Sequence, residues 1–312
     1  MIDLHQISHY YGAHCALRDV TLQVEPGAVG LIGQNGAGKS TLLKILLGML
    51  RPTRGGGTVL GLDIHADALQ LRGRIGFMPE VESLIPGIRG VDLVALAGEL
   101  EGMPRKQALR RAHEVLSYLG LEEVRYRRCE QYSVGMKQRL KLAAALVHDP
   151  ELLLLDEPTA GLDPDGREAM LNLLQRLASR HGKSLILSTH LLGDIDRVCQ
   201  QVLIVDRGTV LGVGPIGDLR AQFAGRFQLR WRGTPESFLQ GLAADGVQVL
   251  ERPRPDEALV EVPAAWQVRR FFEHARSNAL SLRAVTPQRE ELEGLYHRLI
   301  GAGRGVGVTG GG

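Results

Sequence analysis

The chain has 312 residues, of which 44% are hydrophobic and 23% charged, and its formal net charge is +2. That length suffices for about two domains of ~150 residues, and the composition is typical of a folded chain rather than a disordered one. Its apolar runs, such as residues 42–50 and 152–155, are shorter than the roughly 20 residues that a membrane-crossing helix needs. The small net charge does not by itself indicate nucleic-acid binding.

The N-terminus has neither a basic start nor an apolar stretch of signal-peptide length, so we expect the protein to remain in the cytosol. The three cysteines, Cys15, Cys129 and Cys199, have no paired spacing. We therefore expect them to be reduced packing residues rather than metal or redox centres.

The first 210 or so residues alternate apolar, β-rich runs with helical patterns, which is typical of an α/β fold. A strand is predicted over residues 29–32, followed by a glycine-rich turn and a helix over 40–50. Helical periodicity over 91–100 and 106–119 predicts an inserted helical block at about residues 80–145. Buried strands follow, and they are predicted over 152–155, 184–188 and 201–205.

A break is predicted at residues 212–215, so we expect a first domain over 1–215 and a small α+β accessory domain over 216–300. The order of elements expected in the second domain is β-α-β-β-α-β and a final helix, compatible with a ferredoxin-like domain. The expected ranges are 226–232, 235–243, 246–251, 258–262, 265–277, 280–286 and 289–299. The glycine-rich tail, residues 301–312, is predicted to be disordered.

A phosphate-binding loop is predicted between the first buried strand and the following helix. The pattern of glycine, four residues, glycine, lysine and serine matches residues 33–40. Glycines let successive backbone N–H groups turn toward a polyphosphate, and the helix adds its positive end. Lysine supplies a charge for the outer phosphates, and the hydroxyls supply a Mg²⁺ ligand and a further donor. The predicted binding residues are Gly33, Asn35, Gly36, Ala37, Gly38, Lys39, Ser40 and Thr41.

Two carboxylates, Asp156 and Glu157, end the apolar strand over 152–155. A carboxylate at such a position can hold Mg²⁺, and the next one can orient or deprotonate a water that attacks a γ-phosphate. Downstream of a phosphate loop this pair is a strong indication of phosphoryl-transfer chemistry, because that chemistry depends on positioning and charge neutralisation.

Further motifs resemble those of ATP-binding cassette (ABC) proteins. Residues 132–140, Tyr-Ser-Val-Gly-Met-Lys-Gln-Arg-Leu, resemble the signature motif, residues 161–164 the D-loop, and residues 188–190 the segment of the switch histidine. Together with the two phosphate-site motifs, they stand in the family's order. Residues 1–215 therefore resemble the nucleotide-binding subunit of an ABC transporter. The resemblance implies a mixed-sheet cassette core with an inserted helical subdomain.

The resemblance also implies the roles of individual residues. Tyr11 would stack on adenine, with Tyr10 as the alternative. Ser133 and Gly135 would reach the γ-phosphate of ATP bound to the opposite subunit, and Asp163 would lie across the same interface. His190 would contact the γ-phosphate and the attacking water, and the resemblance implies ATP and Mg²⁺ as ligands.

Several positions depart from the common family pattern. Glu80 stands where the family usually has glutamine; its carboxylate can still reach Mg²⁺ or a bound water, but it changes the local charge. Tyr132, Val134 and Met136 replace the commoner leucine, glycine and glutamine of the signature. These variants, and the segment over residues 282–299, resemble the subgroup that serves ABC-2-type exporters.

The leading hypothesis is an ATP-hydrolysing subunit that works with a second cassette and with separate membrane permease subunits, at the cytoplasmic face of the membrane. Val81, Leu84, Ile85 and Pro86 are predicted to offer the permease an apolar face. Closure of the cassette pair on ATP would drive transport, expected to be export, and hydrolysis would reopen the pair.

The alternative hypothesis is a soluble ABC ATPase acting on ribosomes, nucleic acid or a protein assembly. Arginines interleaved with aromatic residues over 226–232 suggest it. The same alternation fits a half-buried strand with a basic solvent face, so no nucleic-acid partner is expected. The acidic residues of the accessory domain are predicted to lie on its solvated surface rather than in a metal site. They are Glu251, Asp256, Glu257 and Glu261.

Overall fold

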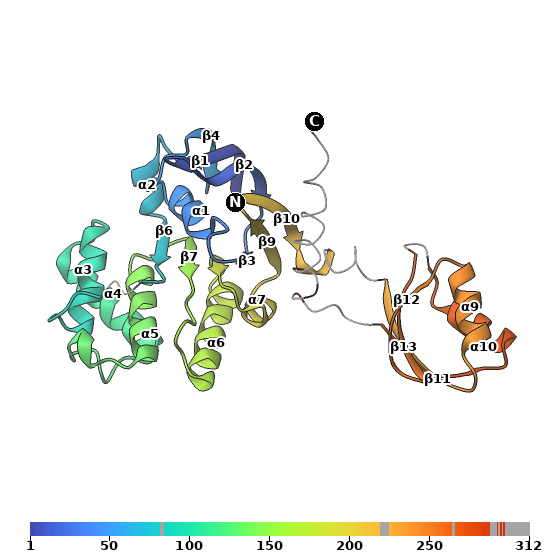
Figure 1. Ribbon diagram of the computed structural model, residues 1–312. Helices are drawn as coiled ribbons and strands as arrows, with labels where there is room; N and C mark the ends of the chain where they lie inside the picture. Colours follow the sequence, from blue (N-terminus) through green and yellow to red (C-terminus); the bar gives the residue numbers. More distant parts are fainter. Residues whose placement is uncertain are drawn as a thin grey trace. The chain divides into compact units, whose positions relative to one another are not determined.

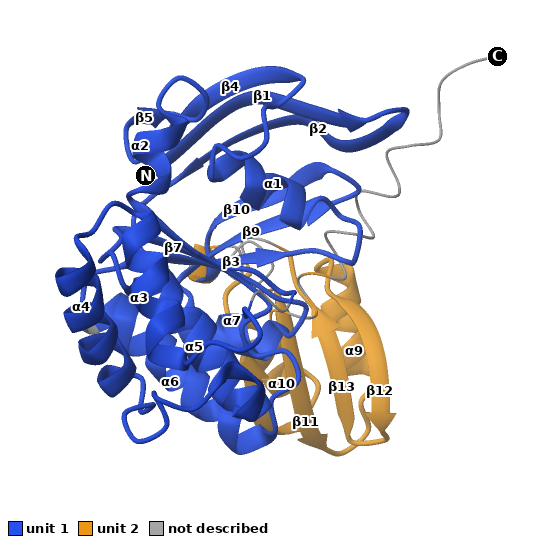
Figure 2. Cartoon of the chain, turned by 90° about the vertical axis from the view of Figure 1, so that its left-hand side faces the viewer, with its two compact units in different colours: residues 1–216, 299–312 blue, residues 217–298 orange. Residues whose placement is uncertain are grey.

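The computed structural model describes residues 1–81, 84–218, 225–263 and 266–287, and also Leu292, Gly294 and Tyr296. The chain divides into a larger unit, Met1–Ile216, and a smaller unit that begins at Gly217 (Figures 1 and 2). The predicted tail over 301–312 lies outside the described residues, as does the predicted helix over 289–299 except for those three residues.

Two β-sheets form the larger unit. The antiparallel sheet has the order β2-β1-β4-β5. Its strands are β1 (Ile2–Tyr11), β2 (His14–Val24), β4 (Arg54–Val59) and β5 (Leu62–Asp63). The other sheet has six strands in the order β10-β9-β3-β8-β7-β6, with β10 antiparallel at one edge and the other neighbours parallel. They are β3 (Ala28–Ile32), β6 (Ile75–Met78), β7 (Leu152–Asp156), β8 (Ser184–Ser188), β9 (Gln201–Asp206) and β10 (Thr209–Pro215).

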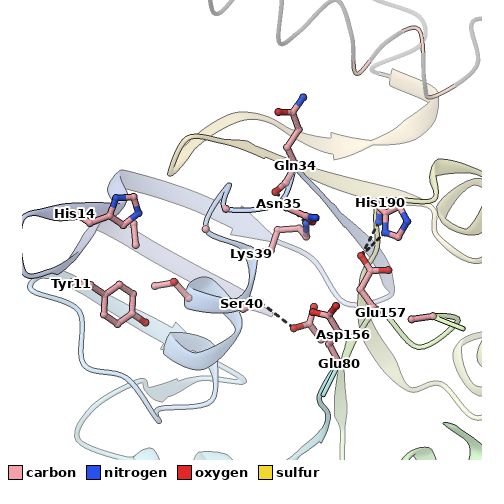
Figure 3. Close-up of a pocket in the computed structure, with 15 residues that line it drawn as sticks. Tyr11, His14, Gln34, Asn35, Lys39, Ser40, Glu80, Asp156, Glu157 and His190 are labelled. Carbon is pink, nitrogen blue, oxygen red and sulfur yellow. Dashed lines mark hydrogen bonds and ion pairs between the residues drawn. The ribbon is translucent and has the colours of Figure 1, made fainter. Parts of the chain in front are cut away.

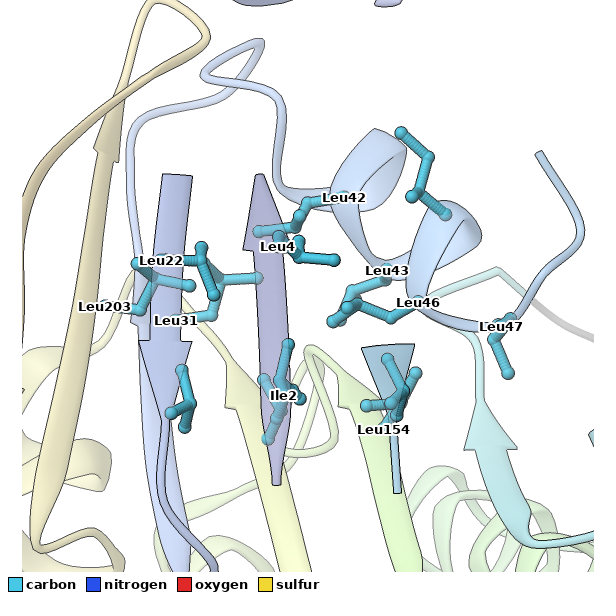
Figure 4. Close-up of a cluster of buried hydrophobic side chains, with 14 of the residues drawn as sticks. Ile2, Leu4, Leu22, Leu31, Leu42, Leu43, Leu46, Leu47, Leu154 and Leu203 are labelled. Atoms are coloured by element: carbon cyan, nitrogen blue, oxygen red, sulfur yellow. The ribbon is translucent and has the colours of Figure 1, made fainter. Parts of the chain in front are cut away.

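The core of the larger unit lies between these two sheets, where helix α1 (Lys39–Leu46) packs. Leu42, Leu43 and Leu46 of α1 belong to one buried cluster with leucines of both sheets, including Leu4 and Leu154 (Figure 4). Burial of each such side chain stabilises the fold by about 1.5–3 kcal/mol. The packed helix fixes the phosphate loop, because that loop is its N-terminal connection to β3.

Helices occupy most of the chain between β6 and β7. Here α3 (Gly90–Leu100), α4 (Arg105–Tyr118) and α5 (Val134–Leu146) pack on one another, with a short 3₁₀ helix, Cys129–Gln131, before α5. This is the predicted helical block, and α3 and α4 agree with the predicted ranges to within one residue at each end. The remaining helices of the unit are α2 (Ala68–Arg72), α6 (Pro164–Arg180) and α7 (Leu192–Val198).

One predicted helix end and the local structure of one predicted break differ from the structure. The helix predicted to reach residue 50 ends at Leu46, because Gly48 adopts a left-handed φ of 62° that stops the helix. The break predicted at residues 212–215 lies within β10, which pairs with β9 as far as Pro215. An edge strand needs partners on one side only, so it accepts glycine and proline residues that a central strand excludes.

Within its described residues, the smaller unit comprises a four-stranded antiparallel sheet and two helices, α9 and α10. In chain order its elements are β11 (Arg226–Arg232), α9 (Glu236–Ala244), β12 (Gln248–Arg254), β13 (Glu257–Glu261), α10 (Arg269–Ser277) and β14 (Ser281–Pro287). The sheet order β12-β13-β11-β14 interleaves the two halves of the β-α-β-β-α-β sequence, as in ferredoxin-like folds. The fold class expected from the sequence is therefore present in both units.

Apolar and polar residues alternate along strand β11, and the apolar side of the strand faces the core of this unit. Leu229 and Trp231 are buried against Phe238 and Phe271 of the two helices, whereas Arg230 is exposed. Phe227 is partly buried against the same core, so the alternation fits a half-buried strand with a basic solvent face.

One acidic residue of the accessory domain was wrongly predicted. Glu251 and Asp256 are exposed, but Glu257 is only 6% exposed. Its carboxylate accepts a hydrogen bond from the Gln228 side chain and lies 3.8 Å from Nε of Arg254. These polar partners compensate for the desolvation of the buried charge.

Candidate functional site

The phosphate loop connects the buried strand β3 to helix α1. Gly38, the last residue before α1, has a φ of 104°, and a Cβ atom there would lie 2.6 Å from the carbonyl oxygen of Ala16. Only glycine fits this conformation and this close approach. Nζ of Lys39 donates a hydrogen bond of 2.6 Å to the carbonyl oxygen of Gly33, so the lysine is held over its own loop.

A cavity of about 460 Å³ opens beside this loop (Figure 3). Residues from the loop, from the tip of the β1–β2 hairpin and from the ends of β6, β7 and β8 line it. They are Tyr11, His14, Ala16, Gln34, Asn35, Gly36, Gly38, Lys39, Ser40, Thr41, Glu80, Asp156, Glu157, Ala160 and His190. The cavity thus brings together most of the residues predicted from the phosphate loop and from the two carboxylates. Gly33 and Ala37 are buried within the loop behind this lining.

Asp156 ends strand β7 at the floor of the cavity. Its Oδ1 accepts a hydrogen bond of 2.8 Å from the hydroxyl of Ser188. Its Oδ2 accepts one of 3.2 Å from the hydroxyl of Ser40, which Figure 3 shows as a dashed line. Ser188 is the residue paired with Asp156 across the parallel strands β7 and β8. The strand register therefore orients this carboxylate toward the first turn of α1.

Glu157 is only 7% exposed, and three hydrogen bonds hold its carboxylate. Oε1 accepts from the backbone N–H of His190 at 3.1 Å and lies 2.9 Å from its Nδ1, and Oε2 accepts from the hydroxyl of Thr189 at 3.1 Å. An ionised carboxylate only accepts hydrogen bonds, so Nδ1 carries a proton in this arrangement. The His190 side chain itself is 62% exposed, which makes the pair accessible from the cavity.

The backbone of Glu157 is in the left-handed region, with a φ of 48°. That conformation is uncommon for residues other than glycine and is found in strained turns at functional sites. Here it turns the chain at the end of β7, so that Asp156 and Glu157 both face the cavity lining.

Tyr11 ends strand β1 at the cavity, and 47% of it is exposed. The ring of His9 contacts the Tyr11 ring edge to face, with centroids 4.7 Å apart. Tyr10, the alternative for base stacking, does not line the cavity. His14 does, and it pairs with Tyr11 across the hairpin. His14 was not predicted from the sequence, although the two-residue turn that begins at Gly12 places it opposite Tyr11.

Glu80 follows strand β6 and lines the cavity opposite the phosphate loop. Its backbone carbonyl accepts a hydrogen bond of 3.0 Å from Nζ of Lys141, a buried residue of α5. The predicted magnesium ligands, Ser40, Glu80 and Asp156, therefore border one cavity and offer the oxygen atoms that Mg²⁺ prefers.

Within the part of the chain that the structure describes, no group of three or more His, Cys, Asp or Glu side chains is arranged to hold a metal ion. Two carboxylates and a hydroxyl suit Mg²⁺, which retains water and shares its remaining positions with phosphate oxygens.

Three predicted residues lie away from the cavity. Ser133 caps helix α5, accepting a hydrogen bond of 3.3 Å from the N–H of Met136, and Asp163 precedes helix α6. Both are exposed, and Gly135 is partly exposed. The single chain does not bring these three together with the phosphate loop.

A second hollow, of about 330 Å³, lies beside the segment that follows Glu80. Three of the four residues predicted to form an apolar face, Leu84, Ile85 and Pro86, line it together with Cys129, Glu130 and Lys137. Val81, the fourth, is exposed and does not belong to this lining. The carboxylate of Glu130 accepts a hydrogen bond from the N–H of Gly87, which holds this segment against the 3₁₀ helix. None of the described helices combines the length and the apolar character needed to cross a membrane.

Comparisons with known proteins agree with this geometry. Residues 17–160 match the sequence profile of the family described as ABC transporter. The uncharacterized ABC transporter ATP-binding protein YxlF of Bacillus subtilis (strain 168) is 32% identical over 304 residues, which cover 97% of this chain and 100% of that protein. The linearmycin resistance ATP-binding protein LnrL of the same strain is 30% identical over 311 residues, with coverage of 96% and 98%.

A relative named for export and one solved structure are also similar. The Nod factor export ATP-binding protein I of Cupriavidus metallidurans is 34% identical over 215 residues, covering 69% of this chain and 71% of that protein. An ATP-binding cassette, solved as a post-hydrolysis dimer with ADP and phosphate, has a TM-score of 0.64 and 26% identity. That match covers 69% of this chain and 99% of the solved chain.

The fold and the cavity define a phosphate-loop nucleotide hydrolase of the cassette type. The chain belongs to the family of ABC transporter ATP-binding proteins, so it is an ATPase that powers transport.

Proposed function

We propose that this chain is the ATP-hydrolysing subunit of an exporter, with catalysis in the cavity at the phosphate loop. The observation that carries the proposal is the arrangement of three parts around one cavity: the loop with Lys39, the Ser40–Asp156 pair and the Glu157–His190 pair. Phosphoryl transfer from ATP to water needs these parts, because it depends on positioning and on charge neutralisation.

The binding roles follow from where each group lies. Tyr11 stacks on adenine at the mouth of the cavity, and the loop N–H groups with Asn35 and Thr41 hold the phosphates. Lys39 exchanges its bond to the Gly33 carbonyl for the outer phosphates. Ser40, Asp156 and Glu80 would hold Mg²⁺, which would neutralise phosphate charge when bound.

The catalytic roles belong to the Glu157–His190 pair. Glu157 accepts a proton from water, the water oxygen bonds to the γ-phosphorus, and ADP departs with the electrons of the broken P–O bond. His190 orients the water and the γ-phosphate while its Nδ1 holds Glu157 in place. The carboxylate already lies within hydrogen-bond distance of three donors, so it is oriented before substrate arrives.

The predicted site residues that lie outside the cavity support the presence of a second cassette. Ser133, Gly135 and Asp163 are accessible but lie away from the phosphate loop of their own chain. In a head-to-tail dimer they complete the ATP site of the other subunit, and the dimeric state of the solved cassette similar to this chain supports this arrangement. Binding of ATP then favours the closed pair, and hydrolysis reopens it.

The proposed partner is a membrane permease of the ABC-2 type, and the working location is the cytoplasmic face of the membrane. The hollow at Leu84, Ile85 and Pro86 is the proposed contact with the permease. Export is the proposed direction, supported by the similarity to the Nod factor export ATP-binding protein. The alternative role on ribosomes or nucleic acid gains no support, because Leu229 and Trp231 are buried in the core.

Copurification tests this function. Tagged Glu157→Gln is captured from detergent-solubilised cells of its native host with Mg-ATP, and Lys39→Ala serves as the matched control. We expect a multispanning membrane protein in stoichiometric amount with the first variant and less with the second. Ribosomes or nucleic acid without a membrane protein would refute the proposed role.

A further inference from the structure

An ion pair between a buried aspartate and a partly exposed arginine lies outside the lining of the catalytic cavity and takes no part in the chemistry described above. Asp194 of helix α7 is 0% exposed. Its Oδ1 lies 2.6 Å from Nη2 and 2.7 Å from Nε of Arg167, and its Oδ2 accepts a hydrogen bond of 2.6 Å from the hydroxyl of Thr159. Both carboxylate oxygens therefore have strong donors, as a buried charge requires.

The three residues come from three different segments. Thr159 lies two residues after Glu157, Asp194 lies four residues after His190, and Arg167 is in helix α6. Helices α6 and α7 lie side by side (Figure 1). The network thus ties the segment that follows the catalytic carboxylate to the segment that follows the histidine.

A parallel connection joins the same two segments on the cavity side. There the hydroxyl of Thr189 donates to Glu157 and accepts a hydrogen bond of 3.1 Å from the N–H of Leu191. Two connections, one at the cavity and one outside its lining, fix the two segments more rigidly than either would alone. The left-handed backbone of Glu157 needs such support, since an uncommon conformation persists only where its surroundings impose it.

Helix α5 reaches the same segment from a third side. Nε2 of Gln138, which is 7% exposed, donates a hydrogen bond of 3.0 Å to the carbonyl oxygen of Ala160. The chain from Glu157 to Ala160 is therefore held by α5, α6 and α7, and its position depends on all three.

We propose that Thr159, Arg167 and Asp194 form a positioning triad, which sets the distance and orientation between Glu157 and His190. The inference rests on the proposed function, because it assigns hydrolysis to that pair. None of the three residues lines the cavity at the phosphate loop, so we expect the loss of the triad to lower the rate of hydrolysis and to leave ATP binding at that loop intact.

The test uses the full-length chain and the variant Thr159→Val, which keeps the side-chain shape and removes the hydroxyl. We expect kcat for ATP hydrolysis to fall about tenfold. KM and the Kd for Mg-ATP should stay within about twofold of the wild type, because the triad affects the chemical step and not the binding of ATP. Thr159→Ser restores the hydroxyl and should restore kcat.

Ser184→Ala is the matched control. Ser184 lies at the other end of β8 and is also buried, and its hydroxyl accepts a hydrogen bond of 3.2 Å from the N–H of Gly27. Its loss should lower Tm without changing kcat. If Thr159→Val is too unstable to assay, Arg167→Lys keeps a cation beside Asp194 and should lower kcat several-fold on the same grounds.

Two results would overturn the triad: a folded Thr159→Val with kcat within about twofold of the wild type, or equal losses of kcat in Thr159→Val and Ser184→Ala. A wild-type chain that binds ATP but does not hydrolyse it, alone or with its permease, would instead refute the proposed function.

Discussion

Replacing Glu157 by glutamine should greatly reduce ATP hydrolysis while leaving ATP binding intact. The structure allows the effects of this substitution on stability and on the rate of hydrolysis to be worked out. The carboxylate accepts hydrogen bonds from the Thr189 hydroxyl and from two donors of His190. A glutamine oxygen can keep both His190 contacts, and its NH₂ group can donate to the Thr189 hydroxyl. Exchanging charged for neutral hydrogen bonds costs about 1 kcal/mol in stability.

The effect of losing the general base on the rate of hydrolysis is larger than this effect on stability. Such a group contributes about 10²–10⁴ to the rate, which corresponds to roughly 3–5 kcal/mol in the activation free energy. Because Glu157 does not hold the phosphates, we expect hydrolysis to fall at least about a hundredfold. The Kd for Mg-ATP should stay within about twofold, and a closed dimer should accumulate.

The assay measures phosphate release at saturating Mg-ATP, nucleotide affinity by calorimetry and dimer formation by size-exclusion chromatography. Glu151→Gln is the control. Glu151 lies immediately before the first residue of β7, whereas Glu157 follows the last one, and its carboxylate forms a surface ion pair of 2.6 Å with Arg74. Hydrolysis by Glu157→Gln at more than about a tenth of the wild-type rate would refute the assignment of the base.

Three further outcomes follow from the packing. Gly38→Ala forces a Cβ atom to within 2.6 Å of the Ala16 carbonyl, so ATP affinity measured by calorimetry should fall at least about tenfold. Leu229→Ala removes a fully buried side chain and should destabilise the smaller unit by about 2–5 kcal/mol, seen by calorimetry as an earlier unfolding step. Lys183 lowers the pKa of Asp149 by a hydrogen bond of 2.8 Å, so this stabilisation is present above about pH 4 and is lost as the pH falls through the lowered pKa. The Tm difference between wild type and Lys183→Met should therefore shrink in acid.

Each of these has a matched control. Gly56→Ala places its Cβ in open space, Arg230→Ala changes an exposed neighbour in β11, and Lys106→Met removes an exposed lysine. An equal effect of a control and its partner variant would contradict the explanation given for that position.

The local structure around the candidate site was predictable where the sequence pattern specifies one kind of element. The run of four leucines before Asp156 indicates a buried parallel strand, and the residues that follow such a strand lie at the carboxyl edge of the sheet. The phosphate loop was predictable for the same reason, since glycine spacing and the flanking strand and helix specify one local structure.

What was not predictable depends on contacts between distant residues. The pairing of Thr159 with Asp194 spans 35 positions and leaves no periodic pattern. From the sequence alone, Glu257 is expected on the surface. Only the pairing of β11 with β13 brings the Gln228 side chain within hydrogen-bond distance of it. Strand β10 was missed because its glycines and proline indicate a turn locally, and only the partner strand β9 makes it part of a sheet.

The parallel register of β7 and β8 has a consequence for how this enzyme can evolve. Because Asp156 pairs with Ser188, one alignment of two strands sets both the Ser188–Asp156 bond and the contacts of Glu157 with the next two residues. Shifting either strand by one residue moves its side chains about 3.3 Å and to the opposite face. Substitutions in these strands can therefore accumulate one at a time, whereas a single insertion or deletion within either strand would dismantle both carboxylate sites in one step. Length variation among descendants of this chain should thus fall in the connections and spare β7 and β8.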